Sequence, residues 1–413
     1  MREKIIAHLD DPGQLERLYR KDKSTFIREF NALSPEFAEN KLVIFWKERL
    51  NFPRDDFFRG SPKDLLFVAI TTLIAGLIAK LPAFFAVEEE FFYPRNIGFI
   101  IFPALSAFFA WKNKLSRAKI AFIAGTTLIA AIFINSLPFG ENSDTLILSC
   151  IHLVLFLWCI LGFTFVSGLK NDSEKRLNFL KYNGDLIVIT ALLLIAGAIM
   201  TGITINLFEL IDLKIEKFYF EYVVVFGLPC VPILGTWLIR TNPQLVGKVS
   251  PVIAKVFSPL VLVMLVVYLI AMIYSGKDPY RDREFLLIFN GLLIGVMAII
   301  FFSIAENSGT KSLSEIWVLL LLSVVTVIVN GIALSAILFR ISEWGITPNR
   351  AAVLGGNILI LINLLLVTAQ LAKIVVKKDK TTGVGSAIAS YLPVYFFWTI
   401  VVTFLFPLIF GFK

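Results

Sequence analysis

Residues 313–339 read LSEIWVLLLLSVVTVIVNGIALSAILF, and Glu315 is the only charged residue among them. About 20 consecutive, predominantly apolar residues are enough to cross the hydrocarbon core of a bilayer as a helix. This stretch therefore predicts a transmembrane helix.

Stretches of the same kind recur from residue 64 onward, separated by short polar loops. They lie at 65–87, 96–111, 118–138, 145–168, 185–211, 219–240, 254–275, 284–306, 313–339, 350–372 and 388–412. Residues 64–413 are thus predicted to form an all-α, polytopic transmembrane helical bundle of about 11 spans, with boundaries good to a few residues.

The composition agrees with a membrane protein. Hydrophobic residues make up 57% of the chain and charged residues 17%, whereas soluble domains have about 45–50% and about 25%. The net charge of +8 does not indicate nucleic-acid binding, because no basic run is interleaved with stacking aromatics. We read it as attraction to lipid headgroups, so membrane lipids are expected partners.

The three cysteines, Cys150, Cys159 and Cys230, all lie in apolar stretches. Their odd number and placement argue against a disulfide framework or a metal cluster. The sequence also lacks a phosphate-binding loop and a nucleophile elbow. We therefore expect no metal site, no cofactor and no catalytic residues, and enzyme activity is disfavoured.

Residues 1–63 differ from the rest of the chain because they are rich in charge. Asp11-Pro12 and Ser34-Pro35 each place a capping side chain before a proline, which is typical of a helix start. Apolar residues recur at helical spacing after both. We predict a short cytosolic region of amphipathic helices that either lies on the membrane face or docks a protein partner.

Basic residues in the loops set the expected orientation. The loops at 112–119, 170–181, 240–255 and 373–380 carry more Lys and Arg than those on the opposite side. The positive-inside rule then places the N-terminus in the cytoplasm and the C-terminus outside. The bias weakens after residue 255, so a miscounted span would invert only the predicted orientation of the spans after that residue.

A few polar residues fall where lipid should exclude them. Asn206, Glu209 and Asp212 share one helical face with Gly202, and this face is expected to point into the bundle. It predicts either a cation or proton site at the mouth of a cavity, or carboxylates that only reach interfacial water. Lys80 either extends to the outer headgroups or forms a buried ion pair with Glu209 or Asp212.

Two later stretches carry polar residues at helical spacing, and these are Ser323, Thr326 and Asn330 in the first and Gly356, Asn363 and Gln370 in the second. We expect helix-packing seams, with a polar substrate path as the alternative. Gly291 and Gly295 likewise form a close-packing motif.

The segment 340–350, RISEWGITPNR, joins two predicted spans. Arg340 and Glu343 can pair across one helical turn. Gly345 can adopt the positive φ that ends a helix, and Thr347 followed by proline predicts the start of the next. The segment therefore predicts a tight helical hairpin.

These residues carry a resemblance to a known family. The string from Arg340 through Glu343, Gly345, Thr347 and Asn349 to Arg350 resembles the signature hairpin of the multi-pass membrane family called domain of unknown function 4153. The N-terminal pattern around Tyr19-Arg20 and Phe45-Trp46 is similar to members with a short cytosolic lead. The resemblance implies a protein of the bacterial cytoplasmic (inner) membrane without an established activity; Ala351 departs from the aromatic that follows the last arginine in members.

Three functions stay open from the sequence. The first is a transporter or permease-like protein for a small solute or ion, indicated by Lys80 and the acidic face of the fifth span. The second is a non-catalytic envelope or signalling component that binds a partner through its N-terminal helices. The third is an enzyme on a lipid-linked substrate, in which Arg340, Glu343 and Arg350 hold a phosphate.

Overall fold

The computed structural model describes residues 1–37, 39–51, 62–138, 143–168, 172–209, 213–242, 250–275, 280, 283–306, 312–377 and 382–412. Within these ranges the secondary structure is entirely helical. The chain divides into two compact units, Met1–Arg59 and Gly60–Lys413, each with its own hydrophobic core.

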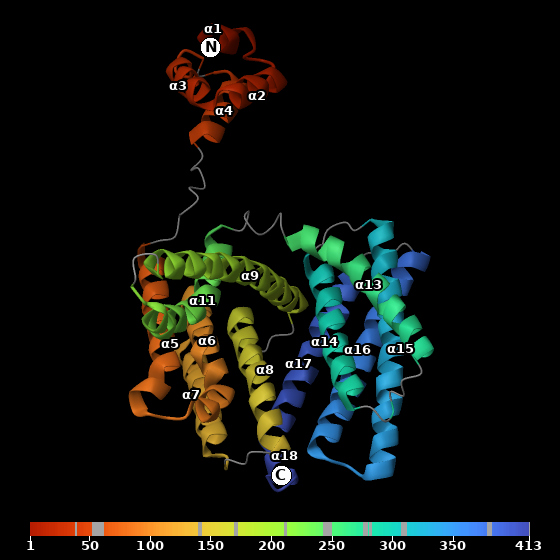
Figure 1. Cartoon of the computed structure of the whole chain (residues 1–413). Helices are drawn as coiled ribbons and strands as arrows, with labels where there is room; N and C mark the ends of the chain where they lie inside the picture. The colour runs from red at the N-terminus through yellow and green to blue at the C-terminus, as the bar shows by residue number, and fades with distance from the viewer. Residues whose placement is uncertain are drawn as a thin grey trace. The chain divides into compact units, whose positions relative to one another are not determined.

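The N-terminal unit contains four short helices (Figure 1): α1 (Arg2–Ala7), α2 (Pro12–Lys21), α3 (Lys23–Leu33) and α4 (Lys41–Asn51). Asp11 caps α2 as predicted, by accepting from the backbone amides of Gly13 and Gln14. The predicted long helix after Asp11 is instead two helices, because the Asp22 side chain caps a new start. The predicted start at Ser34-Pro35 is wrong.

Aromatic side chains fill the core of this unit. Phe26, Phe30 and Trp46 are buried and contact one another. Arg49 stacks on Trp46 and forms an ion pair with Glu16 at 2.7 Å, which ties α4 to α2. A hydrogen bond from Arg20, and then the charge of Arg49, lower the pKa of the Glu16 carboxyl.

The second unit is built from long helices, two of which contain a π-helical segment. They are α5 (Pro62–Phe85), α6 (Glu89–Lys112), α7 (Arg117–Ser136), α8 (Asp144–Val166), α9 (Ser173–Glu209), α10 (Glu216–Phe218), η1 (Tyr219–Val224), α11 (Val225–Thr241), α13 (Ser250–Ser275), α14 (Arg283–Glu306), α15 (Leu313–Trp344), α16 (Pro348–Lys377), α17 (Thr382–Ile400), η2 (Val401–Leu405) and α18 (Phe406–Ile409). Segments η1 and η2 continue directly into α11 and α18.

Every predicted span lies on one of these helices, but within the described residues eight are long and apolar enough to cross a membrane. The predicted spans in α6, α13 and α14 are the exceptions. In α6 the apolar stretch is bracketed by Arg95, Asn96 and Lys112. The described apolar parts of α13 and α14 cover only Lys255–Val267 and Asn290–Ala305.

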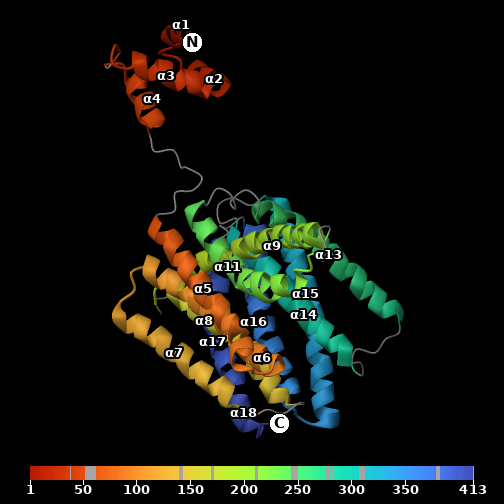
Figure 2. The same cartoon turned by 60° about the vertical axis from the view of Figure 1, so that its left-hand side comes forward.

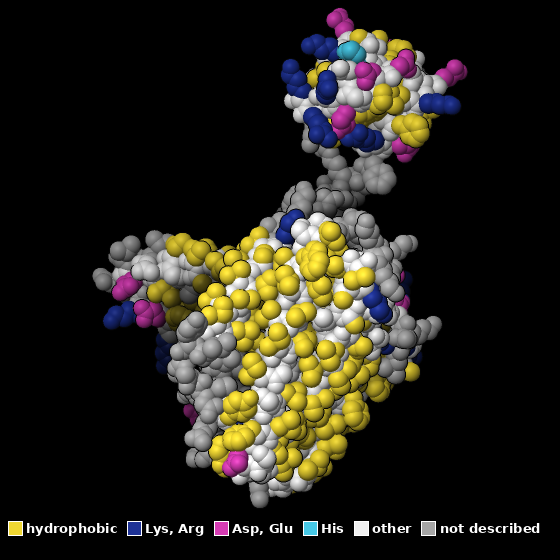
Figure 3. All heavy atoms as spheres, turned by 90° about the vertical axis from the view of Figure 1, so that its right-hand side faces the viewer, with side chains coloured by type: hydrophobic (Ala, Val, Ile, Leu, Met, Phe, Trp, Pro, Cys, Tyr) yellow, Lys and Arg dark blue, Asp and Glu magenta, His cyan; other side chains and the backbone are white. Residues whose placement is uncertain are grey.

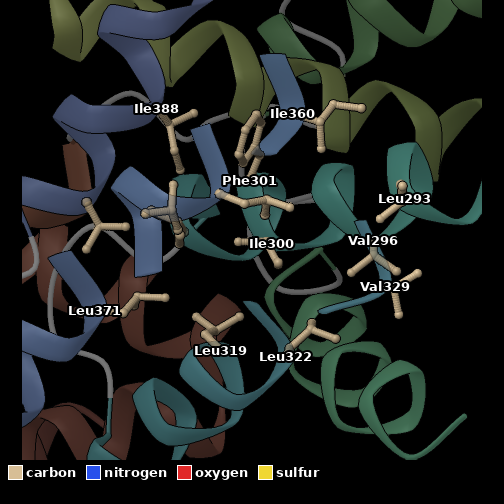
Figure 4. Close-up of a cluster of buried hydrophobic side chains, with 14 of the residues drawn as sticks. Leu293, Val296, Ile300, Phe301, Leu319, Leu322, Val329, Ile360, Leu371 and Ile388 are labelled. Atoms are coloured by element: carbon tan, nitrogen blue, oxygen red, sulfur yellow. The ribbon is translucent and has the colours of Figure 1, made fainter. Parts of the chain in front are cut away.

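The largest core lies among α13 to α17. Figure 4 shows Ile300 and Phe301 of α14 among side chains of α15, α16 and α17, including Leu319, Ile360 and Ile388. Residues that repeat every three or four positions form this core, as expected for helices packed along one stripe. A second core joins α5, α6, α8, α9 and α11.

Helix α9 connects the two cores. It packs against α8, α11, α14 and α17, and Figures 1 and 2 both show it running across the direction of its neighbours. It is the least buried of the eight candidate spans. Most side chains from Ala191 to Glu209 are exposed in the single chain.

The surface of the second unit is apolar where a bilayer would contact it. Figure 3 shows a broad face of hydrophobic side chains with few charges. Large apolar residues on α5, α7, α9, α13 and α15 are exposed. A monomeric soluble protein rarely exposes a continuous apolar patch of more than a few hundred Å², so this surface suits lipid.

Candidate functional site

The predicted acidic face of α9 does not point into the bundle. Asn206 is exposed, and its amide donates to the backbone oxygen of Gly202 at 2.7 Å. Glu209, the last residue of α9, is also exposed, and Asp212 lies outside the described residues. Within the described part of the chain, this face therefore meets neither Lys80 nor a cavity.

Lys80 is buried, with 7% of its surface exposed. Its Nζ donates to the backbone oxygen of Glu221 at 2.8 Å and lies 4.4 Å from the centroid of the Tyr222 ring. Its ammonium thus points at η1. It forms no ion pair with Glu209.

The hairpin between α15 and α16 has the predicted backbone. Gly345 has φ +75° and its amide donates to Ile341 at 2.9 Å, which ends α15. The Thr347 hydroxyl accepts from the Arg350 amide at 3.3 Å and so caps α16. Both capping predictions are confirmed.

The charged residues of the hairpin bind backbone oxygens. Arg350 donates to Trp344 and Gly345 at 2.9 and 2.7 Å, and Arg340 donates to Tyr280 at 2.9 Å. The predicted Arg340–Glu343 pair is absent from the described structure, where Glu343 is exposed. Asn349 is half-buried beside them. The Arg350 bonds hold the turn, and the Arg340 bond ties the end of α15 to Tyr280.

A file of buried and half-buried polar side chains runs along the facing sides of α15, α16 and α17. At one level the Thr368 hydroxyl donates to Ser323 at 3.1 Å. At another, the Asn330 amide donates to the backbone oxygen of Asn357 at 3.2 Å. We call these four residues, together with Asn363 and Tyr395, the polar file.

Asn363 extends the polar file toward α17. Its amide donates to the Tyr395 hydroxyl at 3.0 Å, and that hydroxyl donates to the sulfur of Met297 on α14 at 3.3 Å. Asn363 is fully buried. The file therefore reaches four helices of the largest core.

Three buried amides of the polar file are incompletely satisfied. Asn330 Oδ1, Asn357 Nδ2 and Asn363 Oδ1 have no hydrogen-bond partner in the described structure. A buried polar atom left without a partner costs about 1–3 kcal/mol. Two free acceptors and one free donor therefore line the interior of these helices.

Sequence reasoning identified Asn330 and Asn363 but missed Asn357, Thr368 and Tyr395. The position of Asn357 could have been predicted, because the two helices joined at Gly345 run antiparallel. Residues at equal distance from that turn face each other, which places Asn330 within one turn of Asn357. Nothing in the sequence connects Tyr395 to Asn363.

His152 of α8 and the glycines Gly291 and Gly295 of α14 do not take part in the polar file. His152 bonds the backbone oxygen of Leu148 at 2.9 Å in its own helix. No described atom lies within 4 Å of the Cβ that an alanine would carry at Gly291 or Gly295, so the expected close packing is not seen among the described residues. No group of three His, Cys, Asp or Glu side chains that could hold a metal occurs among the described residues.

The long apolar helices, the lipid-facing surface and the buried polar groups define an all-α integral membrane protein. Comparisons of the chain with protein-family models, curated proteins and solved structures find no match. Its function therefore has to be inferred from its own residues.

Proposed function

We propose that the protein is a permease-like transporter for a small polar solute or ion. The observation that carries this proposal is the set of unsatisfied amides of Asn330, Asn357 and Asn363. All three side chains are at least 97% buried, as their exposed fractions of 0%, 3% and 0% show.

Helix packing alone accounts poorly for these amides. An interhelical hydrogen bond within a membrane contributes only about 0.6 kcal/mol on average, which is less than the cost of an unsatisfied atom. Apolar residues would hold the same helices together without that cost. A polar solute or water that passes through the file would pair with the free atoms and offset it.

The polar file lies within the hydrophobic core of α13 to α17, on helices rather than on loops. A site on packed helices keeps its geometry better than one on loops. Selectivity for a small solute is therefore compatible with this location.

The expected location is the cytoplasmic membrane of a bacterium, with the N-terminus inside and the C-terminus outside. This arrangement requires an odd number of spans, such as the eleven predicted from the sequence, of which eight meet the length and hydropathy criteria within the described residues. The excess of Lys and Arg in alternate loops supports it. Alkaline phosphatase fused after residue 413 should be active, whereas green fluorescent protein fused at the same position should not fluoresce. The reverse pattern would invert the proposed orientation.

We also propose membership of the family called domain of unknown function 4153. The hairpin from Arg340 to Arg350 supports this, since its glycine, threonine and last arginine each make a bond that fixes the turn. A residue pattern with such structural roles is expected to persist within a family.

Flux through proteoliposomes tests the transport proposal. Vesicles carrying the full chain are challenged with urea, glycerol or an alkali salt, and volume recovery is followed by stopped-flow light scattering. At least one solute should equilibrate faster than in protein-free vesicles. Replacing Asn330 and Asn363 together by Leu should return the rate to that of empty vesicles.

The matched control replaces two other membrane amides. Asn96 and Asn135 bond each other reciprocally at 2.9 Å in both directions, so they leave no atom for a solute. The Asn96→Leu/Asn135→Leu variant should keep the wild-type rate. Equal rates for wild type and the Asn330/Asn363 double variant would refute the proposal.

A further inference from the structure

Lys80 is a buried cation that the polar file does not use. It lies on α5, five residues before Phe85 ends the helix, which corresponds to about 7.5 Å along the axis. A lysine within a membrane helix is costly unless it has a partner, and is by default a sign of function.

The packing of α5 on α11 explains why Lys80 reaches η1. The ring of Phe226 lies where a Cβ at Gly76 would stand, 2.1 Å from it, so glycine permits a close approach. One turn further, the antiparallel helices bring Lys80 beside Tyr222. The side chain is held in place by the backbone oxygen of Glu221 and the face of that ring.

The charge of this ammonium is not neutralised within the described structure. Lys80 makes a single hydrogen bond, to a neutral carbonyl, although an ammonium has three donors. The Glu221 carboxylate is directed to Lys217, at 3.9 Å. The carboxylates at the adjoining turn, Glu88 to Glu90, are exposed.

The wall that faces Lys80 is a π-helical segment. Such segments are rare and occur frequently at functional sites. Tyr222 is 46% exposed, so the ring that covers the Lys80 ammonium lies at the surface of the described chain. The site therefore combines a fixed, uncompensated cation with an accessible rim.

We infer that Lys80 and η1 form a binding site for a phosphate-type oxyanion. Two free N–H donors and a full positive charge match such a group, since lysine binds phosphate as a point charge. The depth of Lys80, near the end of its helix, suits the phosphate of an anionic lipid as well as a free phosphate ion. The site is separate from the polar file and does not depend on transport.

Thermal unfolding of the purified full chain in maltoside detergent tests this site. One arm compares sodium phosphate with sodium chloride at equal ionic strength. The other compares short-chain phosphatidylglycerol with phosphatidylcholine. In at least one arm the anion should raise the wild-type Tm by on the order of 3 °C, because a ligand of the native state stabilises it.

The variants assign that response to Lys80. Lys80→Gln should lose it and Lys80→Arg should keep it. Lys214→Gln removes an exposed lysine close to η1 in the sequence and should also keep it. A response only to free phosphate or only to the lipid identifies the source of the oxyanion.

Two results would overturn the inference. One is a wild type that responds in neither arm, and the other is a Lys80→Gln variant that responds like wild type. If Lys80→Gln fails to fold, amine labelling of the wild type decides instead. Acetylation of Lys80, measured by peptide mass spectrometry against Lys217, should slow by about threefold with saturating anion; an unchanged rate overturns it.

Discussion

Gly345 shows how a single residue fixes the hairpin that joins α15 and α16. Its φ of +75° and ψ of 178° place it in a region that is essentially restricted to glycine. The oxygen of Gly345 also accepts from Arg350, so any shift of the turn disturbs a charged hydrogen bond. The turn requires glycine here because of its backbone conformation, and not because a neighbouring residue fills the space where a side chain would lie.

Replacing Gly345 by alanine should therefore destabilise the protein by about 1–3 kcal/mol. Intrinsic tryptophan fluorescence during heating in detergent would record this as a lower Tm. Gly331→Ala is the matched control, since it lies within α15 and no described atom is within 4 Å of the new Cβ. Equal Tm values for the two variants would contradict the assigned role of the turn.

Other single residues could be placed only in part from the sequence. The capping roles of Asp11, Gly345 and Thr347 follow from local chemistry, and the structure confirms them. The partner of Lys80 could not be predicted from the sequence, because Glu221 lies 141 positions away and offers its backbone oxygen rather than its carboxylate. Sequence patterns carry no information about such a contact.

At the scale of elements, hydropathy located all the long helices of the second unit. The apolar stretches that it found differ in length. In α6 the stretch 96–111 is shorter than the about 20 residues that a span needs and is bracketed by Arg95 and Lys112, whereas α15 offers 313–339. The number of helices was thus predictable, whereas the number able to cross a membrane within the described residues was not.

Helix α9 is the clearest case of this limit. Its apolar length predicted a span, and the spacing of Gly202, Asn206 and Glu209 by four and then three residues predicted an inward face. The direction of a helix and the side on which it finds partners depend on tertiary packing. Most of the C-terminal half of α9 is exposed, so the spacing was right and the inferred facing was wrong.

At the scale of the whole molecule, the chain combines a small helical unit that has its own aromatic core with a large membrane unit. The N-terminal unit exposes Phe45 to 71% beside its buried Trp46. In the membrane unit the buried polar groups include the polar file and Lys80, and also Asp64, Arg95 and Asp185. The first two carry the proposed transport path and the proposed oxyanion site.

The most direct test of the central claim is whether the polar file admits water. Asn330→Cys and Ala333→Cys place a thiol at two positions of α15 that are both fully buried. A charged methanethiosulfonate reagent is added to the full chain, and each site is followed by peptide mass spectrometry. The account predicts that the cysteine at 330 reacts at least about tenfold faster, since a thiol must ionise in contact with water to react. Two equally inert cysteines would mean that the buried amides are packing contacts alone, and would contradict it.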